Sequence, residues 1–218
     1  MDPTGAYDAE RASALSGVPK STIHYWARTH LLVPSVSVEK VKLWSHADLV
    51  GLRLIYWLRR TKTRTLGPSI PPTNMRAIRA ALAKLRSLPD PQTPESSLWI
   101  NGAGRIYLRD TTGAPATLDG QLAIEKAINL IAPFSTAEGL TGPDLLRPRP
   151  ELRIVPGKLS GSPHIVDTRL ETRALYALKR DGIEESVIAK LYPFVTPKQI
   201  AEALDLESQL EKNISIAA

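Results

Sequence analysis

A short segment near the N-terminus groups side chains that could read DNA bases. When residues 18–28 are wound as a helix at about 100° per residue, cationic and hydrogen-bonding side chains fall within one arc. The side chains on this arc are those of Lys20, Ser21, His24, Tyr25 and Arg28. Ile23, Trp26 and Ala27 fall on the opposite side, where they would hold the helix against a core. Such a helix can lie in the major groove and donate hydrogen bonds to base edges, although an ordinary solvated helix surface is the simpler alternative.

The sequence before this segment predicts the other half of a helix-turn-helix. A first helix is expected from Asp8, as its N-cap, to Leu15, and Gly17 suits the left-handed position that ends it. Pro19 then stands where proline is favoured, at the start of the next helix. Two helices joined by a short glycine turn are the arrangement that presents a second, reading helix to DNA.

The sequence after the segment predicts a wing and further helices. β-branched residues alternate within residues 31–43, which indicates a small hairpin with Lys40 and Lys42 on the same side. Residues 45–48, Ser-His-Ala-Asp, have the pattern of a capping box, and they open a helix that ends at Arg59-Arg60. Another helix, also basic, is expected over residues 74–88.

The distribution of charge favours a polyanionic partner for the N-terminal end. The chain of 218 residues has a formal net charge of +6. Residues 49–89 contain no acidic residue but nine basic ones, whereas residues 184–211 contain six acidic and two basic residues. The nine basic residues are Arg53, Arg59, Arg60, Lys62, Arg64, Arg76, Arg79, Lys84 and Arg86. A run of this length favours contact with phosphates over a merely solvated surface.

Residues 7–60 resemble the DNA-binding domain of the MerR family. The resemblance rests on residues 15–26, Leu-Ser-Gly-Val-Pro-Lys-Ser-Thr-Ile-His-Tyr-Trp, and on residues 43–49, Leu-Trp-Ser-His-Ala-Asp-Leu. It implies that the second helix enters the major groove while the wing and the following helix hold phosphates. The family usually has arginine where His24 stands, and a histidine there brings less charge and could make the contact sensitive to pH. The expected DNA-binding residues are Lys20, Ser21, Thr22, His24, Tyr25, Arg28, Lys40, Lys42, Arg59, Arg60, Lys62 and Arg64.

The middle of the chain predicts a small β region without recognisable chemistry. Residues 90–97 have the composition of a linker, and residues 98–101 and 105–108 flank Gly-Ala-Gly as the two strands of a hairpin. A third strand is expected at residues 116–118, and the apolar residues 124–131 predict a helix. Residues 139–150 are rich in Gly, Pro and Arg and are expected to form a second linker. We expect this middle part to contribute packing or a dimer contact.

The C-terminal part predicts a strand at residues 151–155 and then three short helices, the last of which opens with the capping box of residues 196–199. This part resembles a small domain that often accompanies bacterial toxin–antitoxin operons. The matching residues are Gly161, Pro163, Ile165, Thr168, Arg169, Gly182, Ile188, Tyr192, Pro193, Thr196, Ile200, Ala203 and Leu204. That family usually has glycine where Asp167 precedes the Thr-Arg pair, so the local turn can differ here.

Together, the two ends resemble an antitoxin of the mycobacterial VapB class. This resemblance implies a toxin partner, a PIN-domain ribonuclease with an acidic, magnesium-binding site, and repression of the shared operon. An arginine from the C-terminal half would then enter the acidic site of the toxin as a charge-assisted contact. The eligible arginines are Arg147, Arg149, Arg153, Arg169 and Arg173. The sequence does not choose among them, and for Arg169 a solvated side chain beside a helix cap is an equal alternative.

Composition argues against several other classes of protein. The chain has no cysteine, which excludes disulfides and thiolate metal sites, and its four histidines lack metal-ligand spacing. No apolar run reaches the roughly 20 residues of a membrane span, and the N-terminus is unlike a signal peptide, so we expect a cytoplasmic protein. No carboxylates form a convincing acid–base pair, and the serines beside His164 suit a turn, so we expect no catalysis and no metal or cofactor.

These observations predict a mainly α fold with small β elements. Residues 1–66 would form a winged helix-turn-helix, residues 67–138 a central helix and β-hairpin region with a role in dimerisation, and residues 139–218 a three-helix, helix-turn-helix-like domain. We expect an antitoxin that represses its own operon, binding double-stranded operator DNA and a PIN-domain toxin. It should be a homodimer, because one reading head covers only a half-site. The alternatives are a free-standing MerR-like regulator with a small effector and an adaptor that docks on an acidic protein.

Overall fold

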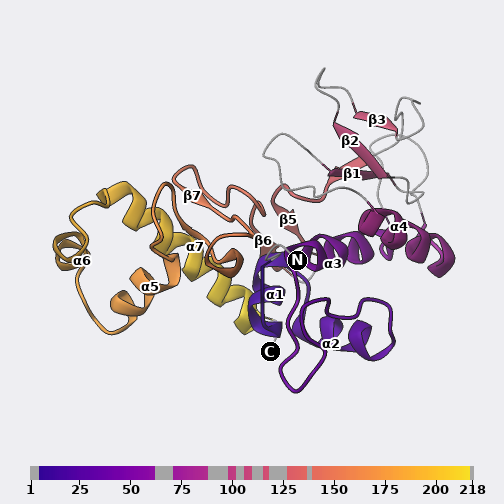
Figure 1. Ribbon diagram of the computed structural model, residues 1–218, viewed down its shortest axis with the longest axis horizontal. Helices are drawn as coiled ribbons and strands as arrows, with labels where there is room; N and C mark the ends of the chain where they lie inside the picture. The colour runs from indigo at the N-terminus through magenta and orange to yellow at the C-terminus, as the bar shows by residue number, and fades with distance from the viewer. Residues whose placement is uncertain are drawn as a thin grey trace.

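Helices dominate the computed structural model, which describes residues 5–61, 71–87, 98–101, 106–109, 115–117, 127–136 and 139–216 (Figure 1). The helices are α1 (Ala9–Ser16), α2 (Lys20–Arg28), α3 (His46–Leu58), α4 (Met75–Ser87), α5 (Thr172–Arg180), α6 (Glu185–Leu191) and α7 (Pro197–Ile216). The strands are β1 (Leu98–Asn101), β2 (Ile106–Arg109), β3 (Pro115–Thr117), β4 (Ala127–Asn129), β5 (Phe134–Ser135), β6 (Thr141–Gly142), β7 (Leu152–Arg153) and β8 (His164–Ile165). Helices with small antiparallel strand pairs confirm the predicted fold class. Among these described residues, no helix is both long and apolar enough to cross a membrane.

Local sequence signals produce the helix-turn-helix where it was expected. The Asp8 carboxylate accepts a hydrogen bond from the backbone N–H of Arg11 at 2.7 Å and so caps α1. Gly17 ends the helix at a φ of 73°, a conformation that favours glycine. In α2, the buried side chains are Ile23, Trp26 and Ala27. The apolar face predicted for this helix therefore packs against the core.

The wing is shorter than a regular hairpin. Ser37 pairs with Leu43 as an isolated antiparallel bridge, and Tyr7 pairs in the same way with Trp44. The capping box that follows is confirmed, because the Asp48 N–H donates to Ser45 Oγ at 3.1 Å and the Ser45 N–H donates to Asp48 Oδ2 at 2.9 Å. The end of the wing is thus fixed by two contacts: the bridge between Trp44 and Tyr7, and the capping box at the start of α3.

The central region forms a four-stranded antiparallel sheet in the order β3-β2-β1-β4, and α4 lies beside it (Figure 1). The predicted hairpin and third strand are confirmed as β1, β2 and β3. The predicted helix over residues 124–131 is wrong, because residues 127–129 form β4 and pair with β1, Ile128 opposite Ile100. A short apolar run has no period that distinguishes a buried strand from a buried helix, and pairing with β1 decided the outcome.

The segment predicted as a second linker, residues 139–150, is instead packed between the two ends of the chain. Strand β6 in this segment pairs with β5, and Leu140 and Leu145 are buried. Its Gly142 is required by a close approach, since a Cβ there would lie 2.5 Å from Arg53 Nη2 and 2.7 Å from the Leu15 carbonyl oxygen. Gly142 therefore reflects close packing, and the segment is not a free linker.

Arg53 corrects the interpretation of the basic run. Its side chain is fully buried and cannot reach a polyanion. The guanidinium donates to the carbonyl oxygens of Leu15 at 2.7 Å, Ser16 at 3.2 Å and Pro143 at 2.6 Å. It also donates to the carbonyls of residues 130–132. Burial lowers the pKa of this guanidinium to about 9. Arg53 thus ties α1 and α3 to the packed segment and belongs to the core.

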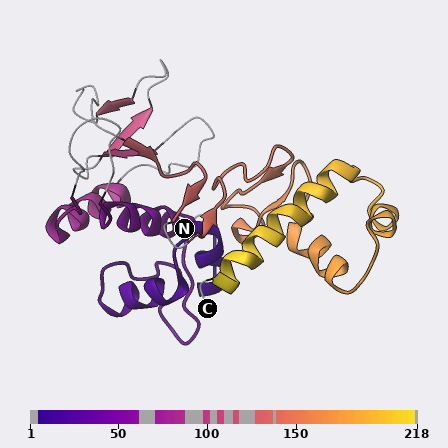
Figure 2. The ribbon, with the colours of Figure 1, turned by 180° about the vertical axis from the view of Figure 1, so that it is seen from behind.

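The C-terminal part contains the three predicted helices, preceded by the pair β7–β8. The capping box of α7 is confirmed, because the Gln199 N–H donates to Thr196 Oγ1 at 3.2 Å and the Thr196 N–H donates to Gln199 Oε1 at 2.9 Å. Ile200, Ala203 and Leu210 of α7 are buried. Figure 2 shows α7 running from the region of α6 to α1, so one helix connects the C-terminal part to the helix-turn-helix.

Polar contacts lock α7 onto α1. Arg11 donates to both oxygens of Glu207, at 2.7 Å each, and the Glu207 side chain is 6% exposed. The hydroxyl of Thr172 donates to the same carboxylate. Further along α7, Asn213 Nδ2 donates to the Ala14 carbonyl at 2.9 Å. Buried hydrophobic residues from both parts form one continuous core, so the helix-turn-helix and the C-terminal part pack together.

Candidate nucleic-acid interface

The exposed side of α2 carries the side chains that the sequence placed there. Ser21, Tyr25 and Arg28 are exposed, and Lys20, Thr22 and His24 are half-buried. Lys20 Nζ lies 2.6 Å from Glu10 Oε1 of α1, in an ion pair exposed to solvent. Such a pair is weak in water, so Lys20 can exchange its partner for a phosphate at little cost.

One flank of α2 faces the wing. The ring of His24 lies edge-on to the ring of Trp44, with centroids 6.1 Å apart. Burial, and then the positive charges of Lys20, Lys42 and Arg28, lower the pKa of His24 below its ordinary value. The wing lysine therefore acts on the same ring as the two cations of α2. These residues form a cationic cluster, which we define as Lys20, His24, Arg28 and Lys42.

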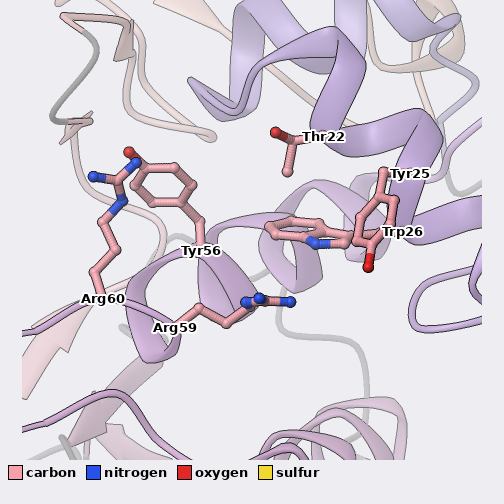
Figure 3. A pocket seen from close by; sticks show the side chains of 6 residues that line it. All are labelled: Thr22, Tyr25, Trp26, Tyr56, Arg59 and Arg60. Atoms are coloured by element: carbon pink, nitrogen blue, oxygen red, sulfur yellow. The ribbon is translucent and has the colours of Figure 1, made fainter.

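The other flank of α2 faces the end of α3, where a pocket of about 480 Å³ opens. The residues that line this pocket are Thr22, Tyr25, Trp26, Tyr56, Arg59 and Arg60. Arg60 stacks on Tyr56, with the guanidinium carbon 4.4 Å from the ring centroid. Figure 3 shows Arg59 extending toward Trp26. Two guanidinium groups beside a hydroxyl and aromatic rings suit a phosphate and its sugar.

Sequence reasoning missed two features of this surface. Tyr56 is buried, yet its ring also lines the pocket; the signal was an aromatic residue one turn before two arginines. The wing also exposes three valines beside its lysines: Val36, Val38 and Val41. Methyl groups at such a place can contact thymine methyls or deoxyribose. Lys40 is exposed on the same wing, whereas Lys62 and Arg64 lie outside the described residues.

Comparison with known families agrees with this geometry. Residues 7–66 match the family described as MerR HTH family regulatory protein. The N-terminal part is a MerR-family helix-turn-helix domain. Residues 153–206 match a second family, described as a protein of unknown function, DUF433. No curated protein and no solved structure matches the chain.

The MerR-family domain contains both flanks of α2. The match spans α1, α2, the wing and α3, and it therefore includes the cationic cluster and the pocket at Arg59. A MerR-family domain indicates a DNA-binding regulator. The DUF433 match extends from β7 into α7 and identifies a second domain without indicating what it binds.

The structure separates the five arginines that the sequence left equivalent. Arg149 is held by Asp205 Oδ2 at 2.8 Å and by Gln209 Oε1 at 2.6 Å. Arg153 donates to the carbonyls of Pro150 and Leu152 at 2.8 and 2.7 Å. The other three, Arg147, Arg169 and Arg173, are exposed.

Arg169 and Arg173, both within the DUF433 match, line an open pocket of about 500 Å³ beside α5. Its floor consists of Leu170, Ala174 and Ala177, and Glu171 pairs with Arg173 Nε at 2.8 Å. The surface combines apolar area with two guanidinium groups. Among the described residues, no group of three acidic or histidine side chains is placed to hold a metal ion.

Proposed function

We propose that the chain is a DNA-binding antitoxin that represses its own operon and neutralises a PIN-domain ribonuclease encoded beside it. The observation that carries the DNA part is the position of α2 between two cationic flanks: the cluster with Lys42 of the wing and the pocket with Arg59 of α3. A helix in the major groove has a phosphate backbone on each side, so cations are needed on both flanks.

The two flanks and the exposed face of α2 would contact different parts of the DNA. Arg59, Arg60 and Lys42 would contact phosphates and set the position of the helix along the groove. Ser21, Tyr25 and Arg28 would face base edges, because they are the fully exposed side chains on the outer face of α2. One such head reads only a half-site, so we propose a homodimer that binds two half-sites about 34 Å apart.

The toxin would bind at the other side of the molecule. The resemblance to VapB-class antitoxins supports a partner for the C-terminal part, which contains the DUF433 match. Arg169 and Arg173 are the best candidates for contacts with the acidic site of the toxin, since both are exposed and line the open pocket beside α5. Arg173 forms one ion pair, with Glu171, at the surface, whereas Arg149 and Arg153 each form two or more hydrogen bonds within the chain. Figures 1 and 2 both show α1 between α2 and α5, so DNA and toxin could be bound at the same time.

The DNA part is tested by a gel-shift assay on the duplex immediately upstream of the gene. Lys20→Ala combined with Arg28→Ala should weaken binding at least about tenfold at moderate salt. The matched control is Arg147→Ala with Lys190→Ala, which removes the same two charge types from exposed C-terminal positions. Equal affinities for the reading-face variant and the wild type would reject α2 as the reading helix.

The toxin part is tested by co-purification with the product of an adjacent gene that encodes a PIN-domain protein. Arg169→Ala combined with Arg173→Ala should abolish co-purification and leave DNA affinity unchanged. Arg180→Ala, at the exposed end of the same helix, serves as the control. If the wild-type chain neither binds nor inhibits any co-encoded ribonuclease, the antitoxin assignment fails and the DNA assignment stands.

The alternative is a free-standing MerR-like regulator whose C-terminal part binds a small effector. The observation that favours it is the MerR match, which needs no toxin partner. In both cases we propose a cytoplasmic protein without catalytic activity or cofactor. The absence of any PIN-domain gene beside this one would favour the alternative.

A further inference from the structure

We infer that operator binding is linked to the uptake of one proton by His24, so that affinity for DNA rises as the pH falls. The inference rests on the proposed DNA-binding function and adds a regulation to the same site. It depends on which charged groups surround the imidazole before and after phosphates arrive.

In the free chain, the surroundings of His24 oppose a positive charge on its ring. Lys20 and Arg28 lie one helical turn before and after it on α2, and the positive charge of Lys42, on the wing, also acts on the ring. Trp44 packs edge-on against the ring and removes water from that side. From α1, Glu10 pairs with Lys20 at 2.6 Å and does not act directly on the imidazole.

These surroundings hold the pKa of His24 below its ordinary value, through burial first and the three cations second. These surroundings therefore favour the neutral ring, which offers one donor and one acceptor nitrogen. A neutral histidine among three cations is a group whose charge state an incoming anion can change.

A DNA backbone reverses the electrostatic balance of the cluster. Phosphates bound by Lys20 and Lys42 offset the repulsion that kept the ring neutral and add attraction for a proton. The protonated ring has two N–H donors, which both suit phosphate oxygens. The pKa of His24 is then higher in the complex than in the free chain.

The direction in which affinity changes with pH follows from the order of these two pKa values. Above the pKa in the complex, His24 is neutral in both states and affinity does not depend on pH. Between the two pKa values, the complex holds one proton more than the free chain, so affinity rises by up to about tenfold for each unit of decreasing pH. Below the pKa of the free chain, both states are protonated and the rise ends.

The test measures affinity for the labelled upstream duplex from pH 8.0 to 5.5 at fixed ionic strength. We expect wild-type affinity to increase at least about fivefold over this range. His24→Gln keeps a neutral polar side chain and should give an affinity that does not change with pH. His24→Arg should also give a constant affinity, at least as high as that of the wild type at pH 8.0.

A matched control comes from the neighbouring histidine. His30 is exposed, follows α2, and has a φ of 52° that asparagine tolerates, so His30→Asn should keep the pH dependence of the wild type. An NMR titration of the His24 ring proton, in the free chain and with DNA, should show the pKa rising on binding. This measurement needs no variant.

Three results would overturn the inference while leaving the proposed function intact: wild-type affinity that is constant with pH, a His24→Gln variant that keeps the wild-type dependence, or an NMR pKa that does not rise on binding. If the wild-type chain binds no duplex at any pH, the proposed function fails and this inference fails with it.

Discussion

The two ends of the molecule carry similar basic side chains but place their charges in opposite surroundings. In the C-terminal part, several basic residues are paired with acidic ones on neighbouring turns and segments. These pairs are Lys179–Glu185, Arg149–Asp205, Lys198–Glu151 and Arg173–Glu171. Around α2, Lys42 and Arg28 instead lie close enough to His24 to lower its pKa.

This difference explains why charge alone is a poor guide to an interface. Paired charges produce little potential beyond their own neighbourhood, whereas like charges gathered on one surface attract an anion from a distance. Arg53 adds a third case, a cation surrounded by backbone carbonyls inside the core. A basic side chain can therefore pair with an acid at the surface, belong to an anion-binding site, or donate hydrogen bonds to backbone carbonyls inside the core.

The largest expected effect is on stability and comes from Arg53→Met. Methionine fills similar volume but leaves the carbonyls of Leu15 and Pro143 buried without their donor. The loss should be about 4 kcal/mol or more in the free energy of unfolding, measured by urea denaturation. Arg59→Met is the control, because Arg59 is exposed and its removal should cost less than about 0.5 kcal/mol. Similar losses in the two variants would contradict the internal role of Arg53.

A smaller loss is expected from Glu207→Gln. This change leaves Arg11 with a neutral partner in a pair that is almost buried, and it removes the acceptor charge beside Thr172. Breaking one partner of such a pair costs about 3 kcal/mol, and the same denaturation experiment measures it. Glu185→Gln breaks the exposed pair with Lys179 and should cost less than about 1 kcal/mol. If the two variants lose equal stability, α7 is not locked onto α1 by this contact.

The parts of the fold that the sequence predicted were those with local causes. Gly17, the Asp8 cap and the capping box at Ser45 each act within four residues, so the helix-turn-helix and α3 could be placed without knowing their partners. The predictions that were wrong depended on contacts between residues far apart in the sequence. Residues 127–129 form a strand because they pair with β1, and Gly142 is closely packed because Arg53 lies against it.

The same distinction holds for the candidate site. The periodicity of residues 20–28 was enough to place side chains on one face of α2, because the face is a property of a single helix. The approach of Lys42 to His24, and of Arg59 to Trp26, depends on how the wing and α3 pack against α2. Periodicity within one helix carries no information about these distances.

The smallest expected effect tests the difference between the two ends of the molecule most directly, because the two variants each remove one charge, one from each end. Arg59→Ala should lower affinity for the upstream duplex about tenfold and reduce the slope of log affinity against log salt by about one. Lys190→Ala removes one positive charge from the exposed side of α6 and should change neither quantity. Both variants lower the net charge equally, so an effect of overall charge alone would be equal in both. If Lys190→Ala weakens binding as much as Arg59→Ala, overall charge rather than the arrangement around α2 holds the DNA.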